Sequence, residues 1–153
     1  MVKILLFDFS RVLLFPTDDL YTGSLNNLYK EKKNESGFIF TNYFKLNDEI
    51  LIDLKKHSDR RLVIFTSETI QDAPEIKDKV HEVFDTVISA IDLGKGKKDP
   101  GAYTEISIKL GASPSEILFI DDSNENLIAA SHAGLTTYKY INNDELIRKL
   151  SSL

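Results

Sequence analysis

The stretch Ile117-Leu118-Phe119-Ile120-Asp121-Asp122 decides the predicted fold. Four consecutive apolar residues without helical period predict a strand that is covered on both faces, as in a parallel sheet. Two adjacent carboxylates follow the strand directly. Because neighbouring negative charges repel each other, they indicate a site that holds a positive charge at the end of this strand.

Four other apolar runs, rich in β-branched and aromatic residues, predict further buried strands. They are Lys3 to Phe9, Leu62 to Phe65, Thr86 to Ser89 and Thr136 to Ile141. Amphipathic helical patterns lie between the strands. This alternation predicts an α/β fold with a three-layer, doubly wound parallel sheet of the Rossmann-like type. For a chain of 153 residues we expect a single domain, 1–153.

The helical patterns have recognisable starts and ends. At Asp99-Pro100 a capping side chain precedes a proline in the first helical position, and Gly111 is suited to end that helix. Asn47 is the expected cap of an earlier helix. The predicted apolar faces are Ile50, Leu51 and Leu54 after Asn47; Tyr103, Ile106 and Leu110 after Pro100; Leu127 and Ala130 between Ser123 or Asn124 and Gly134; and Leu146, Ile147 and Leu150 after Asn143.

The segment 18–46 fits this alternation worst. Gly23, Asn26, Asn27 and the charged run Lys30–Glu35 predict an insertion, or a reduced cap, after the first strand. Its aromatic residues form either a small packed flap or an exposed contact surface. They are Tyr21, Tyr29, Phe38, Phe40, Tyr43 and Phe44.

Composition argues against several classes of function. The 24 acidic residues outnumber the 19 basic ones, so nucleic-acid backbones and anionic membranes are poor partners. The chain has no cysteine, which rules out disulfides and thiolate chemistry and suits a reducing compartment. The first apolar run ends at Asp8 and is too short for a signal peptide or a membrane span. We therefore expect a cytoplasmic protein without nucleic-acid or membrane partners.

Polar side chains follow the predicted strands, and the carboxyl ends of parallel strands meet at one edge of a sheet. They are Asp8 and Ser10 after the first strand, Thr66 and Ser67 after the second, Lys97 after the third, and Asp121 and Asp122 after the fourth. Clustered carboxylates need a hard cation with oxygen ligands, and Mg²⁺ is the expected one. The cation, the lysine and the hydroxyls could hold a phosphoryl group against an attacking carboxylate.

Taken singly, these residues also have purely structural explanations. An aspartate at a strand end, or the pair Thr66-Ser67, can cap a turn. Lys97 lies close to Lys95 and Lys98, so a solvated basic loop is an alternative. The three histidines are scattered at spacings that do not suit a metal site.

In the order of its motifs the sequence resembles the haloacid dehalogenase (HAD) superfamily of hydrolases, over nearly the whole chain outside 18–46. The matching segments are Phe7-Asp8-Phe9-Ser10-Arg11-Val12-Leu13, Val63-Ile64-Phe65-Thr66-Ser67, Lys97-Lys98-Asp99-Pro100 and 118–130, the last containing Asp121-Asp122-Ser123-Asn124. The segment from 118 through Gly134 is the most specific of the four.

The resemblance implies a Mg²⁺-dependent phosphohydrolase that acts on a phosphorylated small molecule or a larger phospho-substrate. Asp8 would be the nucleophile that forms an aspartyl-phosphate. Thr66 and Ser67 would bind the phosphoryl group, and Lys97 would neutralise both nucleophile and phosphate. The implied Mg²⁺ ligands are Asp8, Asp122, the main-chain carbonyl of Ser10, and Asp121 directly or through water.

The first departure from the family pattern concerns the general acid. Ser10 stands where the family usually has a second aspartate, and Arg11 replaces the glycine that usually follows. A general acid–base contributes about 10²–10⁴ in rate, so a phosphatase without it is expected to be slow or to need a good leaving group. The alternative is a domain that binds metal and phosphate for regulation, without catalysis. Dehalogenase chemistry is a weaker option, and the motif order disfavours a phospho-acceptor receiver domain.

The second departure is size. Asp8 and Thr66 are 66 − 8 = 58 residues apart, which resembles the small-cap or capless members of the superfamily. An open site suits a bulky substrate, or one that a second subunit of a homo-oligomer closes off.

Overall fold

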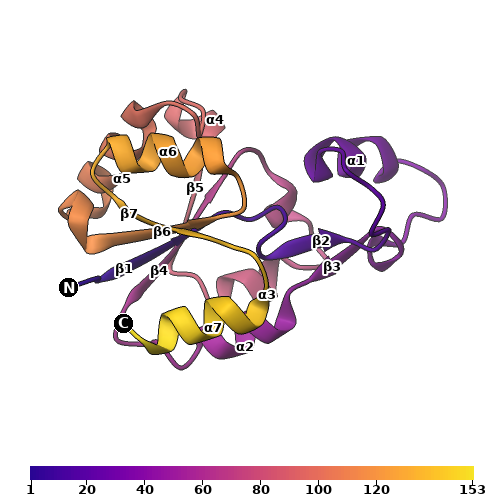
Figure 1. Cartoon of the computed structure of the whole chain (residues 1–153). Helices are drawn as coiled ribbons and strands as arrows, with labels where there is room; N and C mark the ends of the chain where they lie inside the picture. Colours follow the sequence, from indigo (N-terminus) through magenta and orange to yellow (C-terminus); the bar gives the residue numbers. More distant parts are fainter.

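A computed structural model describes all 153 residues and contains a parallel sheet of five strands (Figure 1). In sheet order the strands are β5 (Thr86–Ser89), β4 (Arg61–Thr66), β1 (Ile4–Phe7), β6 (Ile117–Asp121) and β7 (Thr136–Lys139). All five predicted strands are present, and every pairing between them is parallel. The predicted doubly wound α/β fold is confirmed.

Helices cover both faces of this sheet. One face carries α2 (Asp48–Leu54), α3 (Lys77–His81) and α7 (Asn143–Ser151), and the other carries α4 (Ala90–Leu93), α5 (Pro100–Leu110) and α6 (Asn124–His132). Two short 3₁₀ turns, η2 (Ile70–Asp72) and η3 (Pro114–Glu116), connect elements. No helix is long and apolar enough to cross a bilayer.

The central strand β1 shows why its sequence is continuously apolar. Leu5 and Phe7 belong to the hydrophobic core on the α2/α7 side, whereas Ile4 and Leu6 belong to the core on the α5/α6 side. Successive side chains of a strand point to opposite faces, so a strand between two layers of helices buries every residue.

The helix starts were predicted with mixed success. Asp99 caps α5, its side chain accepting from the N–H of Gly101 at 2.8 Å, and Gly111 ends the helix with a φ of 65°. Asn47 precedes α2, but the prediction that its side chain caps the helix is wrong. Its amide instead donates to the carbonyl of Val12 at 2.9 Å and to Asn143 at 2.8 Å, which ties α2 to α7.

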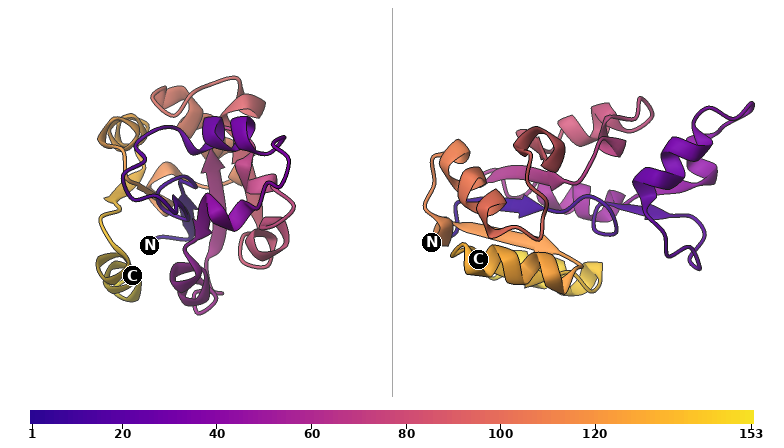
Figure 2. Two further views of the ribbon diagram at one scale, coloured as in Figure 1. Left: turned by 90° about the vertical axis from the view of Figure 1, so that its right-hand side faces the viewer. Right: turned by 90° about the horizontal axis from the view of Figure 1, so that it is seen from above.

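The segment between β1 and α2 forms a small subdomain, called here the excursion. It begins at Leu14, four residues earlier than the predicted insertion, because the chain starts an antiparallel pair there. Its elements are β2 (Leu14–Pro16), α1 (Leu25–Lys32), the 3₁₀ turn η1 (Phe40–Asn42) and β3 (Phe44–Leu46). It projects from the carboxyl end of the sheet, away from both termini (Figures 1 and 2).

Aromatic side chains hold the excursion together. Tyr29 contacts three other rings at centroid distances of 6.1 Å, and Phe40 and Phe44 lie 4.9 Å apart, both buried. Phe38 and Tyr43 stack at 5.7 Å on the outside of this cluster. The aromatic residues therefore form the packed flap that was one of the two predicted alternatives.

Candidate active site

Three carboxylates from two neighbouring strands meet at the carboxyl end of the sheet. Asp8 follows β1, whereas Asp121 ends β6 and Asp122 follows it, and β1 and β6 are paired. One oxygen from each of the three side chains lies within 4.8 Å of the others. Asp8 is 121 − 8 = 113 residues away from Asp121 in the chain. The fold therefore brings Asp8 together with the pair Asp121-Asp122, as predicted.

Lys97 supplies the positive charge closest to this acid cluster. Its Nζ contacts Oδ1 of Asp8 and lies 3.9 Å from Oδ2 of Asp121. The side chain is buried, and the hydroxyl of Tyr103 donates to its main-chain oxygen at 2.7 Å. The neighbouring lysines have other partners, since Lys95 pairs with Glu105 at 2.7 Å and Lys98 pairs with Glu125. The structure therefore brings Lys97 to the acids and leaves the other two lysines outside.

Burial raises the pKa of all three carboxyl groups. The pKa of Asp8 rises to about 6, mainly because burial penalises its charged form; Lys97 opposes this rise and the negative charge of Asp121 adds to it. Burial is also the main reason that the pKa values of Asp121 and Asp122 are raised. One lysine therefore does not compensate the two buried carboxylates and the partly buried Asp122.

The donor set of the cluster fits a hard divalent cation. Three carboxylates whose oxygens lie close together are the kind of ligands that Mg²⁺ prefers. Their raised pKa values show that the cluster lacks positive charge, which a divalent cation would supply. The main-chain carbonyl of Ser10 is also available, because no main-chain N–H donates to it. Asp121 is the most constrained of the three carboxylates, as its two oxygens accept from the N–H of Ser123 at 2.7 Å and from Asn126 at 3.0 Å.

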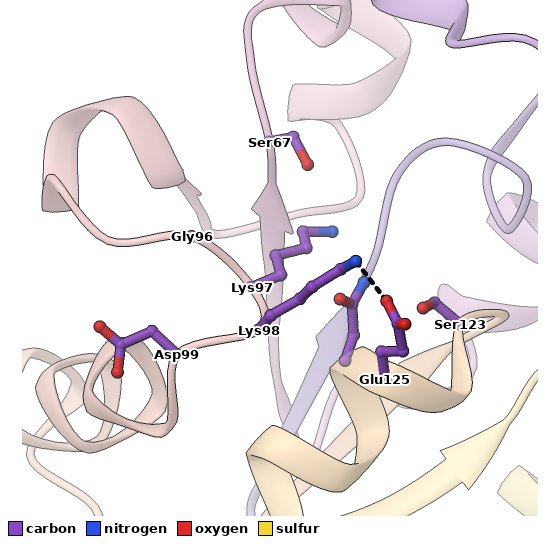
Figure 3. A pocket seen from close by; sticks show the side chains of 8 residues that line it. Ser67, Gly96, Lys97, Lys98, Asp99, Ser123 and Glu125 are labelled. Atoms are coloured by element: carbon purple, nitrogen blue, oxygen red, sulfur yellow. Dashed lines mark ion pairs between the residues drawn. The ribbon is translucent and has the colours of Figure 1, made fainter.

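A polar cavity of about 780 Å³ opens beside the acid cluster (Figure 3). Lys97 and Ser67 point into it, and the ion pair between Lys98 and Glu125 lies across it. None of its lining residues is hydrophobic. Thr66 is buried at the end of β4 and its hydroxyl is hydrogen-bonded to Gln71 at 3.2 Å. Of the two predicted hydroxyls, Ser67 therefore lines the cavity, whereas that of Thr66 is buried and already hydrogen-bonded.

The loop after Asp8 has an uncommon backbone conformation. Arg11 has a φ of 64° and is the only non-glycine residue with a positive φ, at the position where the family pattern has glycine. Its guanidinium group donates to the carbonyls of Tyr21 at 3.1 Å and Gly23 at 2.8 Å. Arg11 thus fastens the excursion to the loop that carries the candidate nucleophile.

Two substitutions separate the backbone and side-chain contributions of Arg11. We expect Arg11→Ala to lower the free energy of unfolding by roughly 1 kcal/mol, because the two hydrogen bonds to the excursion are lost. Arg11→Gly loses the same bonds but adopts a positive φ without steric cost, so it should be about 1 kcal/mol more stable than Arg11→Ala. Urea denaturation of both variants measures this difference, and equal stabilities would contradict backbone strain at this position.

The two acids nearest to Asp8 along the excursion do not join the cluster. Asp18 accepts from the N–H of Leu20 at 2.9 Å, and Asp19 lies 3.6 Å from Lys45. Both side chains are exposed. Neither replaces the missing aspartate at position 10.

Sequence reasoning missed three residues that shape the site: Tyr103, Gln71 and Asn126. Tyr103 was predicted only as a core residue of α5, yet its hydroxyl supports Lys97. Gln71 lies outside every motif segment, and Asn126 lies within the segment 118–130 but was not singled out. Asn126 lies five residues after Asp121, which on a helix that starts at Asn124 places it over the strand end.

The sequence model of the haloacid dehalogenase-like hydrolase family matches residues 38–134. This range contains Thr66, Lys97, Asp121 and Asp122, and it begins after Asp8.

Curated relatives are similar over part of the chain. Enolase-phosphatase E1 of Enterobacter sp. (strain 638) is 40% identical over 62 residues, which is 40% of this chain and 24% of that protein. A phosphatase of Mycobacterium tuberculosis is 36% identical over 78 residues, which is 48% of this chain and 36% of that protein. The matched part of the chain thus spans about a quarter to a third of the length of these relatives.

Solved structures share the fold over nearly the whole chain. A putative beta-phosphoglucomutase from Thermotoga maritima superposes with a TM-score of 0.73 at 18% identity, covering 99% of this chain and 100% of that one. A HAD family enzyme of Bacteroides thetaiotaomicron, in complex with magnesium and inorganic phosphate, superposes with a TM-score of 0.68 at 17% identity and covers 92% and 95% of the two chains.

Proposed function

The chain belongs to the haloacid dehalogenase-like hydrolases, and on that premise we propose that it is a Mg²⁺-dependent phosphohydrolase with Asp8 as its nucleophile. One observation carries the proposal: Asp8, Asp121 and Asp122 offer oxygens within 4.8 Å of one another, and Lys97 contacts Asp8. An attacking carboxylate and a phosphoryl dianion repel each other, so they meet only where positive charge compensates both.

The two oxygens of Asp8 are in different environments. Oδ1 accepts from the N–H of Phe9 at 2.6 Å and from Lys97, whereas no protein group donates to Oδ2. Lys97 opposes the effect of burial on the pKa of Asp8 and so favours the ionised carboxylate, which is the form that attacks phosphorus. A carboxylate oxygen of Asp8 forms a bond to phosphorus as the bond between phosphorus and the leaving oxygen breaks, and the leaving oxygen takes its proton from water. A second water then attacks phosphorus, which releases inorganic phosphate and restores the carboxylate of Asp8.

A divalent cation held by Asp8, Asp121, Asp122 and the carbonyl of Ser10 would neutralise the charge of the phosphoryl oxygens. No hydrophobic residue lines the cavity beside the cluster, and four charged residues do, so it suits a hydrophilic leaving group. The proposed substrates are phosphorylated small molecules, or phospho-groups on a larger partner that reaches the open site.

A Mg²⁺-dependent screen tests the proposal. We expect the chain to release inorganic phosphate from a panel of acyl phosphates and phosphate esters, to stop when EDTA is added, and to resume with excess Mg²⁺. The exposed Asp18→Asn variant is the matched control and should retain the rate, because Asp18 lies outside the acid cluster. Equal release in EDTA would contradict the role of the cation.

A second function, metal and phosphate binding without catalysis, is favoured by Ser10 alone. Under that alternative, the chain binds inorganic phosphate with Mg²⁺ but releases none from any substrate in the panel. Acyl phosphates distinguish the two functions best, since a good leaving group does not need the general acid that Ser10 cannot supply.

A further inference from the structure

The hydroxyl of Thr66 already has a buried hydrogen-bond partner. Its Oγ1 lies 3.2 Å from Oε1 of Gln71, and the two residues are only 1% and 2% exposed. The amide orientation of Gln71 is fixed at its other end, where Nε2 donates to the main-chain oxygen of Glu68 at 3.0 Å and lies 3.4 Å from a carboxylate oxygen of Asp72. Because an amide oxygen only accepts, Thr66 is the donor in its bond with Gln71.

A threonine hydroxyl has a single proton to donate. While that proton points at Gln71, Thr66 presents only lone pairs in other directions, and lone pairs repel the oxygens of a phosphoryl group. The β-branched side chain of Thr66 has little freedom about χ1, especially when buried. Gln71 therefore sets the direction of the Thr66 hydroxyl proton, whereas the restricted χ1 of Thr66 sets the position of its oxygen.

The excursion holds the turn that carries Gln71. Asn26 of α1 is buried, and its Oδ1 accepts from the N–H of Ile70, the first residue of η2, at 3.1 Å. Lys30, one helical turn further along α1, pairs with Glu68 of the same loop. The excursion is thus connected to the loop after β4 as well as to the loop after β1.

We propose that Gln71 is a positioning residue that engages the proton of Thr66 in the free protein and yields it when a phosphoryl group binds. Asn26 keeps Gln71 in place for this exchange. The inference rests on the proposed function and on the role that the family resemblance implies for Thr66, a donor to the phosphoryl group. Binding then costs one buried hydrogen bond, since Oε1 of Gln71 is left without a donor.

Gln71→Met tests the proposal, because methionine has a similar volume and offers no amide acceptor. We expect this variant to bind inorganic phosphate about 3- to 10-fold more tightly than the unmodified chain, measured by isothermal titration calorimetry with Mg²⁺ present. In a Thr66→Val background the same change should have no effect, since there is no hydroxyl proton to release. The two single variants and the double variant form a mutant cycle with a coupling of that size.

The positioning role of Asn26 has its own pair of variants. Asn26→Leu removes the acceptor for the N–H of Ile70, so it should shift the phosphate affinity in the same direction as Gln71→Met, by about 2-fold because the turn is loosened and not removed. Asn26→Asp keeps an acceptor oxygen and should restore the original affinity. Thermal melts establish that each variant is folded before its affinity is compared.

Unchanged or weaker phosphate binding by folded Gln71→Met would overturn the inference, as would an equal shift in the Thr66→Val background. The proposed function fails separately. If the unmodified chain hydrolyses phosphate compounds and Gln71→Met shows no tighter binding, only the inference about Gln71 is lost. If the unmodified chain neither hydrolyses them nor binds inorganic phosphate, the proposed function is overturned and the inference with it.

Discussion

Asp8→Asn is expected to reduce phosphate release by at least about 10⁴-fold, because the amide is not a nucleophile and no other carboxylate occupies its place. The reaction is followed by released inorganic phosphate with saturating Mg²⁺, on the best substrate of the panel. Asp18→Asn serves as the control for the change of an aspartate to asparagine elsewhere. Turnover by Asp8→Asn at the rate of the unmodified chain would contradict the assignment of the nucleophile.

The same variant has a pH signature that does not depend on turnover. The pKa of Asp8 is raised from 3.8 to about 6, so the folded protein binds this proton more tightly than the unfolded chain does. The stability that the folded protein gains from the proton on Asp8 is fully present below pH 4 and is lost as the pH rises through 6. Without metal, Asp8→Asn should therefore be more stable than the unmodified chain at pH 7.5, by an amount on the order of 2–3 kcal/mol.

This difference in stability should close as the pH falls from 6 to 4, because Asp8 then becomes neutral like the asparagine. Urea denaturation in EDTA at several pH values measures it. A constant difference across that range would show that burial does not raise the pKa of Asp8, even if the variant is inactive.

Ser10→Asp is expected to give the second largest effect, a rise in the rate of ester hydrolysis by about 10²–10⁴-fold. Residue 10 lies two residues after Asp8 in the loop that follows β1, and the serine hydroxyl is a much weaker acid than a carboxyl group. The gain should be large for alkyl phosphates, whose leaving oxygen needs a proton, and small for acyl phosphates, whose leaving group departs as an anion.

Ser10→Asn is the matched control, since it has the size of aspartate without the acid. A dependence of rate on leaving-group pKa, measured for the unmodified chain and both variants, separates acid catalysis from a change in packing. If the rate depends on leaving-group pKa as steeply in Ser10→Asp as in Ser10→Asn, the missing aspartate does not explain slow turnover. In that case the alternative of a binding domain gains support.

The sequence predicts the sheet well because the physical signal is strong there. Runs such as Ile117–Ile120 are apolar at every position, as expected of a strand that is covered on both faces. In the structure, every residue of β1 and β6 is buried. The placement of Asp8, Lys97 and Asp121 near one another follows from the same rule, since the ends of parallel strands meet. Their catalytic roles remain predictions, which the variants above test.

Other features depend on contacts that no local pattern encodes. The helix α1 is short and polar and was not predicted; it is held by its contacts with the aromatic cluster and with the Ile70 turn. Asn47 has the identity of a cap but bonds to Val12 and Asn143, which the fold brings to it from elsewhere. Gln71 lies only five residues after Thr66, but no local pattern predicts their hydrogen bond, because Asn26 of the excursion holds the turn between them.

The position of β1 at the centre of the sheet has a consequence for synthesis of the chain. Its partner on one side is β4, and its partner on the other is β6, with Ile4 opposite Ile117, 117 − 4 = 113 residues later. A ribosome must therefore add more than a hundred residues after β1 before this strand gains its second neighbour. Until then a wholly apolar strand edge stays open to other nascent chains, so production is expected to depend on chaperones that shield it.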